Sequence, residues 1–210
     1  MRLYGIPAAG GAASAFQDWP ELTPLRLPGR DQRAAEPIPD TVAELVADLA
    51  DQVGEPGFAL YGHSFGAILA YELARLRPPA HLFVAASADP QTESRHEARE
   101  ESDVDFIARL PGYGVPEEVL ADEELLEVLL PRFRADFALA ERYRYTPGPP
   151  LDCPITVFGG EDDPLVPVET LDRWTAFSLG LVTTHVLPGG HTFPTTARER
   201  LRARIKEETA

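Results

Sequence analysis

One pentapeptide, G-H-S-F-G at residues 62–66, constrains the fold of this chain more than any other feature. It follows an apolar run at residues 58–61 and precedes a segment with helical spacing. A serine hydroxyl is a poor nucleophile unless the backbone presents it to a base, and a sharp strand-to-helix turn does this. Gly62 and Gly66 allow the strand and helix to pass closely. A glycine-rich turn with a chance serine is the alternative, but the flanking pattern favours a nucleophile elbow at Ser64.

Length and charge limit the classes of protein to consider. The chain has 210 residues, enough for one domain with a substantial core. Its formal net charge of −15 disfavours nucleic acid and anionic membranes as partners. The only cysteine, Cys153, cannot form an internal disulfide, which fits a reducing cytoplasm. No apolar run reaches the roughly 18 residues of a membrane-spanning helix. We expect a cytoplasmic protein with no membrane partner.

Short apolar segments alternate with helical patterns along most of the chain. Helices are predicted at residues 41–53, with Asp40 or Thr41 as the N-cap, after the elbow, and at 168–178 and 195–207. The predicted strands are residues 2–6, 25–27, 58–61, 81–86, 155–158 and 184–187. This alternation predicts an α/β fold with a mostly parallel sheet covered by helices.

Residues 89–150 break the alternation. Residues 91–105 are dense in charge, and residues 122–145 carry apolar side chains at helical spacing. This spacing predicts helices bent near Pro131. A helical insertion beside the elbow is expected to form a lid over the site. The alternative is an additional helical layer that only packs against the core.

A serine elbow needs a base, and the chain offers five histidines. One of them follows the last predicted strand on a Gly-Gly turn, at the edge of the sheet where the elbow also lies. That residue, His191, is the predicted base. The others lie inside the elbow, in predicted strands or among charges: His63, His81, His185 and His96.

The orienting acid is expected after the penultimate strand, where three carboxylates stand together as Glu161, Asp162 and Asp163. The pattern G-x-x-D-x-x-V counted from Gly160 selects Asp163. Asp162 is the second choice, and Asp89 is a further alternative at the end of an earlier strand. The order serine, aspartate, histidine is the one used by α/β hydrolases.

A tetrahedral oxyanion needs two backbone N–H donors. One is expected from Phe65, directly after the predicted nucleophile, and the other from the loop at residues 6–14, whose small side chains let the backbone approach a substrate. A phosphate-binding interpretation of Gly10 and Gly11 is weak because no Lys-Ser/Thr pair follows.

Several longer motifs resemble one family, the type II (discrete) thioesterases of polyketide and nonribosomal peptide assembly lines. The resemblance extends over nearly the whole chain. It is carried by P-A-A-G-G at residues 7–11, L-P-G-R at 27–30, G-H-S-F-G-A at 62–67, L-P-R-F-R-A-D-F at 130–137, C-P-I-T-V-F-G-G-E-D-D-P-L-V at 153–166 and P-G-G-H at 188–191. The chain departs from the family at Ala8, where histidine is usual, and in a short stretch at residues 19–25.

The resemblance implies an α/β-hydrolase fold in one domain, residues 1–210, with residues 89–150 as a helical lid. It implies hydrolysis of acyl thioesters on the phosphopantetheine arm of acyl or peptidyl carrier proteins, which are transient partners, to clear stalled or misprimed units. Oxyanion N–H groups are expected from Ala9 and Phe65. The expected catalytic residues are Ser64, Asp163 and His191.

Further expectations concern the substrate and the partner. The insertion has too many apolar residues for a solvated segment, so some should line an acyl channel above the serine: Leu125, Leu129, Phe133 and Phe137. A thioester carbonyl is already activated, so we expect no metal and no cofactor. We expect a monomer. The candidate contacts to acidic carrier proteins are arginines of the insertion, with ordinary solvated surface charge as the alternative: Arg95, Arg99, Arg132, Arg134, Arg142 and Arg144.

Two other functions also fit the sequence. Because a fold does not determine a substrate, the chain could be a small-molecule carboxylester hydrolase. It could also be a carrier-protein-binding scaffold with a degenerate site.

Overall fold

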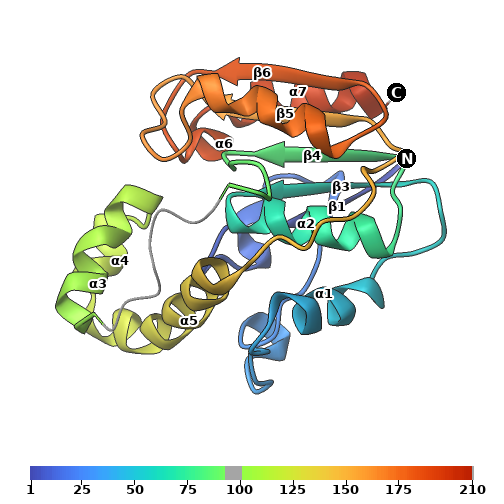
Figure 1. Cartoon of the computed structure of the whole chain (residues 1–210). Coiled ribbons are helices and arrows are strands. Elements are labelled where there is room, and N and C mark those ends of the chain that lie inside the picture. The colour runs from blue at the N-terminus through green and yellow to red at the C-terminus, as the bar shows by residue number, and fades with distance from the viewer. Residues whose placement is uncertain (93–100, 210) are drawn as a thin grey trace.

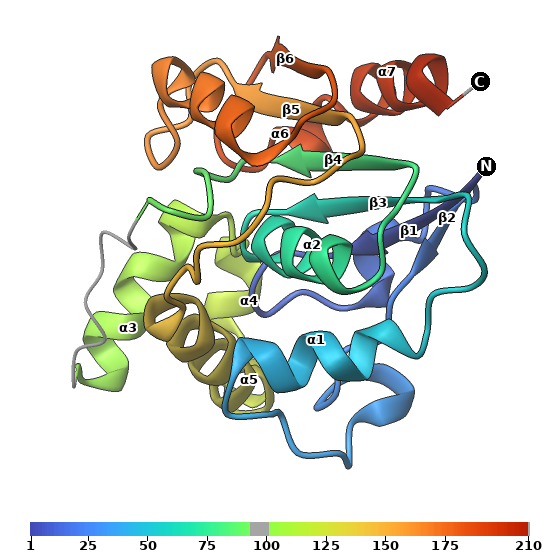
Figure 2. The same cartoon turned by 45° about the vertical axis from the view of Figure 1, so that its right-hand side comes forward.

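Six parallel strands form the centre of the molecule. The computed structural model describes residues 1–92 and 101–209, and the strands lie in the order β2-β1-β3-β4-β5-β6 (Figure 1 and, with β2 labelled, Figure 2). This confirms the predicted α/β class. The strands are β1 (Arg2–Ile6), β2 (Leu22–Pro24), β3 (Phe58–His63), β4 (His81–Ala85), β5 (Ile155–Gly160) and β6 (Val182–Leu187).

Helices cover both faces of the sheet because successive strand residues alternate between the faces. Leu60 packs in one core cluster with α1 (Val42–Ala50) and α2 (Phe65–Leu76). Its neighbour Tyr61 packs in a second cluster on the other face. That face is covered by η1 (Ala13–Phe16) and α7 (Arg198–Thr209). Figure 2 shows α1 and α2 on one side of the strands.

The start of α1 follows from its first residues. Thr41 is the N-cap; its side chain accepts from the backbone N–H of Glu44, whose carboxylate accepts in return from the Thr41 N–H. This capping box stabilises the first turn. The helix ends at Ala50 rather than at the predicted residue 53, although Val53 remains buried in the core.

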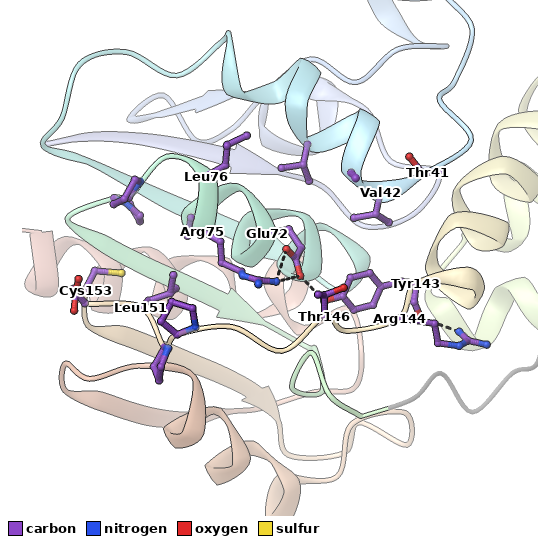
Figure 3. A pocket seen from close by; sticks show the side chains of 18 of the residues that line it. Thr41, Val42, Glu72, Arg75, Leu76, Tyr143, Arg144, Thr146, Leu151 and Cys153 are labelled. Carbon is purple, nitrogen blue, oxygen red and sulfur yellow. Dashed lines mark hydrogen bonds and ion pairs between the residues drawn. The ribbon is translucent and has the colours of Figure 1, made fainter.

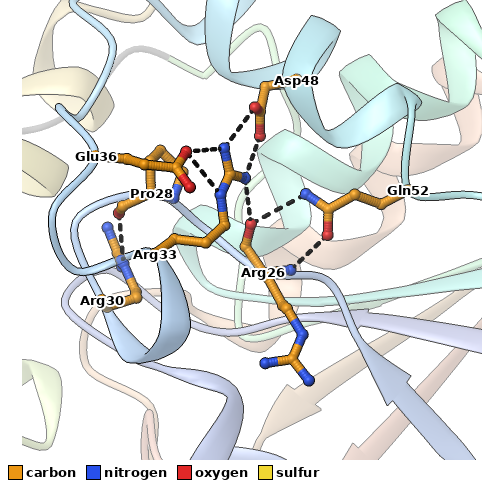
Figure 4. A network of polar contacts seen from close by, with 7 residues as sticks. All are labelled: Arg26, Pro28, Arg30, Arg33, Glu36, Asp48 and Gln52. Carbon is orange, nitrogen blue, oxygen red and sulfur yellow. Dashed lines mark hydrogen bonds and ion pairs between the residues drawn. The ribbon is translucent and has the colours of Figure 1, made fainter.

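The second strand lies earlier in the chain than predicted. Residues 25–27 leave the sheet after Leu25 donates to the Gly5 carbonyl at 2.8 Å. At Arg26 the side chain of Gln52 accepts from the backbone N–H and donates to the carbonyl, at 2.8 and 3.0 Å. Figure 4 shows this arrangement, in which Arg33 also reaches the Arg26 carbonyl. These groups replace a neighbouring strand, so the prediction for residues 25–27 was wrong.

The insertion between β4 and β5 is helical, and residues 93–100 of the charged segment lie outside the described residues. Its elements are α3 (Asp103–Arg109), η3 (Leu110–Tyr113), α4 (Glu117–Ala121) and α5 (Glu123–Arg142). Phe106, Leu110, Phe133 and Phe137 form a small core of their own. Pro131 lies inside α5, which is one helix on both sides of it.

The C-terminal third differs from the prediction in detail. The segment after β5 is a 3₁₀ helix, η4 (Val168–Phe177), and the single helix predicted at residues 195–207 is two helices, α6 (Phe193–Thr196) and α7. The break falls at Ala197. In the described part of the chain, no helix has the length and apolar character needed to cross a membrane.

Candidate active site

Ser64 lies at a strained turn between β3 and α2. Its φ of 55° and ψ of −122° are unusual for a residue with a side chain. The chain turns this sharply because two glycines leave room for backbone. A Cβ on Gly62 would lie 2.3 Å from the Gly66 carbonyl oxygen, and one on Gly66 would lie 2.3 Å from that of Pro7. This geometry is that of a nucleophile elbow.

The structure brings the three predicted catalytic residues together. Ser64 Oγ lies 2.9 Å from His191 Nε2, and His191 Nδ1 lies 2.9 Å from Asp163 Oδ2. Asp163 follows β5 and His191 follows β6, at the same edge of the sheet as the elbow. Both side chains are buried. A serine, an imidazole and a carboxylate in this chain of hydrogen bonds can generate an alkoxide nucleophile.

The contacts distinguish Asp163 from the other carboxylates. Its Oδ1 accepts from the backbone N–H groups of Leu165 and Val166 at 2.9 and 3.2 Å. Burial raises the pKa of this carboxyl, but the hydrogen bond and charge of His191, with the two N–H groups, outweigh it and hold the pKa below its usual value. Asp163 is therefore ionised at neutral pH.

The alternative acids lie elsewhere. Glu161 and Asp162 are exposed on the turn. Asp89 is buried, but it accepts from the N–H groups of Gln91 and Thr92 and from the Thr92 hydroxyl. None of these three carboxylates contacts an imidazole in the described part of the chain.

His63 supports the loop that carries His191. Its Nε2 lies 3.1 Å from the His191 carbonyl oxygen, to which a neutral ring donates. Burial, with the neighbouring His191, lowers the pKa of His63 to about 4. Of the other histidines, His81 stacks on Phe83 and His185 on Phe158; His96 lies outside the described residues.

The loop after β1, from which an oxyanion donor is predicted, is held by residues for which the sequence suggested no role. Asp136 of α5 accepts from the Gly10 N–H at 2.6 Å and forms a buried ion pair with Arg30. Arg30 also donates to the Gly11 carbonyl. Arg30 is the last residue of the L-P-G-R motif and Asp136 lies in the L-P-R-F-R-A-D-F motif. These two motifs were the only sequence features that pointed to the two residues. This loop has Ala8 where the family usually has histidine. Asp136 of α5 fixes the loop through its hydrogen bond to Gly10.

A cavity of about 270 Å³ surrounds Ser64. Ala9 and Phe65, the predicted oxyanion residues, both line it, and so do Ile68, Tyr113 and Ala140. The rest of its wall includes residues after β4 and β5 and the C-terminal part of α5, among them Ser87, Asp89, Thr92, Phe137, Glu141, Tyr143, Leu165, Val166, Thr170 and Arg173.

Only one of the four predicted channel residues borders this cavity. Phe137 lines it, whereas Phe133 packs inside the insertion and against Gly10, where an added Cβ would lie 2.0 Å from its ring. Leu129 packs on the same small core, and Leu125 is exposed. The prediction was wrong for Leu125, Leu129 and Phe133, because side chains on successive turns of α5 have different surroundings. Among the described residues, no group of three histidine, cysteine or acidic side chains is placed to hold a metal ion.

The sheet and the elbow define an α/β-hydrolase protein, and comparison with known proteins narrows this class. The thioesterase-domain profile matches residues 1–208. The gramicidin S biosynthesis protein GrsT of Aneurinibacillus migulanus is 38% identical over 212 residues, covering 92% of this chain and 82% of GrsT. The chain therefore belongs to the thioesterase family.

Solved structures agree with this assignment. RedJ, a thioesterase of the prodiginine pathway in Streptomyces coelicolor, superposes with a TM-score of 0.90 at 35% identity, covering 99% of this chain and 91% of RedJ. BorB, the type II thioesterase of the borrelidin biosynthetic cluster, superposes with a TM-score of 0.87 at 34% identity, covering 99% of this chain and 92% of BorB. The protein is an enzyme that hydrolyses thioesters, and it resembles type II thioesterases over almost its whole length.

Proposed function

We propose that this protein is an editing thioesterase that removes acyl groups from the phosphopantetheine arm of acyl or peptidyl carrier proteins, with Ser64, His191 and Asp163 as its catalytic residues. The observation that carries the proposal is the pair of 2.9 Å contacts from Ser64 to His191 and from His191 to Asp163, at the edge of a cavity. The similarity to type II thioesterases of assembly lines supports the substrate class.

Acylation begins at Ser64. Its Oγ attacks the thioester carbonyl carbon while His191 Nε2 takes the hydroxyl proton. Asp163 keeps the other imidazole proton on Nδ1 and stabilises the imidazolium that forms. The C–S bond then breaks, His191 returns the proton to the departing pantetheine sulfur, and the acyl group remains as an ester on Ser64.

Deacylation repeats these steps with water. His191 accepts a proton from a water molecule as its oxygen attacks the ester carbonyl. The bond to Ser64 Oγ breaks, His191 gives the proton to that oxygen, and the carboxylic acid leaves. The net reaction is hydrolysis of a thioester to an acid and a thiol, and it uses no metal or cofactor.

Two backbone N–H groups, those of Phe65 and Ala9, are proposed to stabilise the oxyanion of the tetrahedral intermediates in acylation and deacylation. Phe65 is the first residue of α2, so its N–H has no partner within the helix. Ala9 lines the same cavity from the loop after β1. Loss of one such donor typically costs about 10²–10³ in kcat.

The pantetheine arm is proposed to enter beside Arg173. Thr92, Thr170 and Arg173 line the polar end of the cavity, and a second hollow at the surface shares Asp89, Thr92 and Arg173 with it. The exposed guanidinium of Arg173 can meet the phosphate of the arm. RedJ has been seen with polyethylene glycol in its active site, which supports a site for an extended, flexible ligand.

The carrier protein is proposed as a transient partner in the cytoplasm. The net charge of −15 opposes long-range attraction to an acidic carrier, so binding needs local arginines. Arg95 and Arg99 lie outside the described residues, and Arg134 pairs with Asp103. Arg142 and Arg144 are exposed, but they line a separate hollow and not the Ser64 cavity. Arg173 lines the cavity at the proposed entrance and is therefore the arginine proposed to meet the carrier protein.

The proposal is tested with an acylated carrier protein and purified wild-type and Ser64→Ala enzymes. Wild-type protein should release the free acid, and the variant should lose on the order of 10⁴–10⁶ in kcat while melting at the same temperature. A fluorophosphonate probe should label Ser64. A wild-type enzyme that prefers p-nitrophenyl esters of the same acyl chain would indicate a carboxylester hydrolase, and a folded protein that neither turns over nor labels would indicate a scaffold.

A further inference from the structure

One face of α2 runs from the Ser64 cavity to a second and larger hollow. Phe65 and Ile68 line the cavity, whereas Glu72 and Arg75 line the second hollow. Residues three or four apart lie on the same face of a helix, so these four side chains form one continuous row. The two hollows are therefore neighbours along α2.

The second hollow is a groove of about 1080 Å³ between α1, α2 and the segment that follows α5 (Figure 3). Much of its wall is apolar: Val42, Val46, Leu76, Leu139, Leu151 and Pro154. Both hollows have Tyr143 in their walls. This half-buried side chain is thus the partition between the cavity and the groove.

A fixed hydrogen bond holds the partition in place. The Tyr143 hydroxyl donates to Glu72 Oε1 at 2.6 Å, and Arg75 donates to both oxygens of the same carboxylate at 3.0 and 3.1 Å. Figure 3 shows Glu72 between Arg75 and Tyr143. Because Tyr143 directly follows the last residue of α5, the helix end also restricts where its ring can lie.

The polarity of the cavity determines which part of a substrate meets Tyr143. The end near Arg173 is polar, while the wall along α2 and α5 is mostly apolar, with Phe65, Ile68, Phe137 and Ala140. Glu141 of α5 also lines it and is paired with Arg109. An acyl chain on Ser64 avoids desolvating polar groups by extending along the apolar wall, away from the entrance of the pantetheine arm.

We propose that Tyr143, held by Glu72, is the specificity-determining residue that limits acyl-chain length, and that the groove behind it accepts the far end of a longer chain once the ring is removed. This rests on the proposed thioesterase function. The occupant is the distal alkyl part of the acyl group, which passes the paired side chains of Glu72 and Arg75 and lies on the apolar part of the groove wall, formed by Val42, Val46 and Leu139.

The test compares the hydrolysis of straight-chain acyl thioesters of N-acetylcysteamine, from short to long, by wild type, Tyr143→Ala and Tyr143→Phe. The alanine variant should move the optimum of kcat/KM to longer chains, with a gain of about tenfold for the longest thioesters relative to the shortest. Tyr143→Phe keeps the ring but loses the hydrogen bond to Glu72, so its optimum should lie between those of wild type and Tyr143→Ala. Ala140→Leu, which fills the cavity before the partition, should move the optimum to shorter chains.

Tyr145→Ala is the matched control, because this nearby tyrosine lines neither hollow and packs on Tyr71 and Phe177. It should leave the chain-length profile unchanged. If Tyr143→Ala does not fold, Tyr143→Leu, which also removes the ring, takes its place. A profile parallel to wild type for the folded variant without the ring would overturn the role of Tyr143. A wild-type enzyme inactive on every thioester would instead overturn the proposed function.

Discussion

Arg30 and Asp136 are 106 residues apart in the sequence, yet their side chains form a buried ion pair with two hydrogen bonds of 2.7 and 2.8 Å. One carboxylate oxygen also accepts from the Gly10 N–H. The pair therefore connects α5 of the insertion to the loop that carries Ala9. Movement of α5 would displace this proposed oxyanion donor.

The Asp136→Asn substitution should be costly because it leaves the Arg30 guanidinium buried without a counter-charge. We expect the free energy of unfolding to fall by about 3–5 kcal/mol and kcat to fall with it. Urea denaturation and steady-state kinetics measure the two effects. The exposed pair of Arg198 and Asp18 is the control: Asp18→Asn should cost less than about 1 kcal/mol.

A double variant separates stability from positioning. Arg30→Met with Asp136→Leu removes both charges, so stability should largely recover. The Gly10 N–H would still lack its acceptor, so kcat should stay low. Recovery of wild-type kcat in the double variant would show that the pair has no part in holding the oxyanion loop.

Asp163→Asn should lower kcat by about 10⁴, because an asparagine cannot hold His191 in the tautomer that accepts the serine proton. The adjacent Asp162→Asn, at an exposed position, is the matched control and should retain the wild-type kcat. Kinetics with one thioester suffice for both variants. A comparable loss at Asp162 would contradict the assigned acid.

Phe137→Ala and Phe133→Ala should differ although both rings are buried in the same small core. Each should lower stability by about 3–5 kcal/mol. Only Phe137 lines the cavity, so only its variant should favour bulkier acyl groups, by roughly 0.8 kcal/mol in transition-state binding per added methylene in contact. Branched and straight acyl thioesters measure the shift. A changed preference in Phe133→Ala would place that ring on the channel after all.

Arg173→Ala should raise KM for phosphate-bearing acyl-pantetheine thioesters by up to about fivefold, and the effect should shrink at high salt. N-acetylcysteamine thioesters carry no phosphate and should be unaffected. Arg200→Ala, an exposed arginine on α7, is the control. An equal effect on both substrate types would argue against a phosphate contact.

His63 should make stability depend on pH. Its folded-state pKa of about 4 lies below the ordinary 6.5, so between these values the unfolded chain binds the proton more readily. Stability should therefore decrease as the pH falls from 6.5 toward 4. Urea denaturation of wild type and His63→Gln at several pH values measures this: the variant should show a shallower decrease. Identical slopes would contradict a neutral, buried His63.

Features encoded in short windows of sequence were predictable. The apolar run before Gly62, the two glycines and the helical spacing after Ser64 specify the elbow, because backbone sterics act between near neighbours. The alternation of strands and helices likewise predicted the parallel sheet. Sequence also singled out His191, which the structure places against Ser64.

Features that depend on distant contacts needed the tertiary structure. The sequence of residues 25–27 predicted a strand, but the side chain of Gln52 hydrogen-bonds to both the N–H and the carbonyl of Arg26. The sequence does not distinguish the apolar residues of α5 from one another. Packing decides that Phe137 lines the cavity while Phe133 packs against Gly10.

Sequence by itself therefore determined the elbow, the α/β class and the family resemblance, since each follows from local backbone preference or a contiguous motif. The motif favoured Asp163, and the tertiary structure decided between it and the alternatives Asp162 and Asp89. Tertiary structure alone decided that Arg30 pairs with Asp136 and that Tyr143 divides two hollows. These contacts join segments far apart in the chain, and their geometry is set by how the helices pack on the sheet.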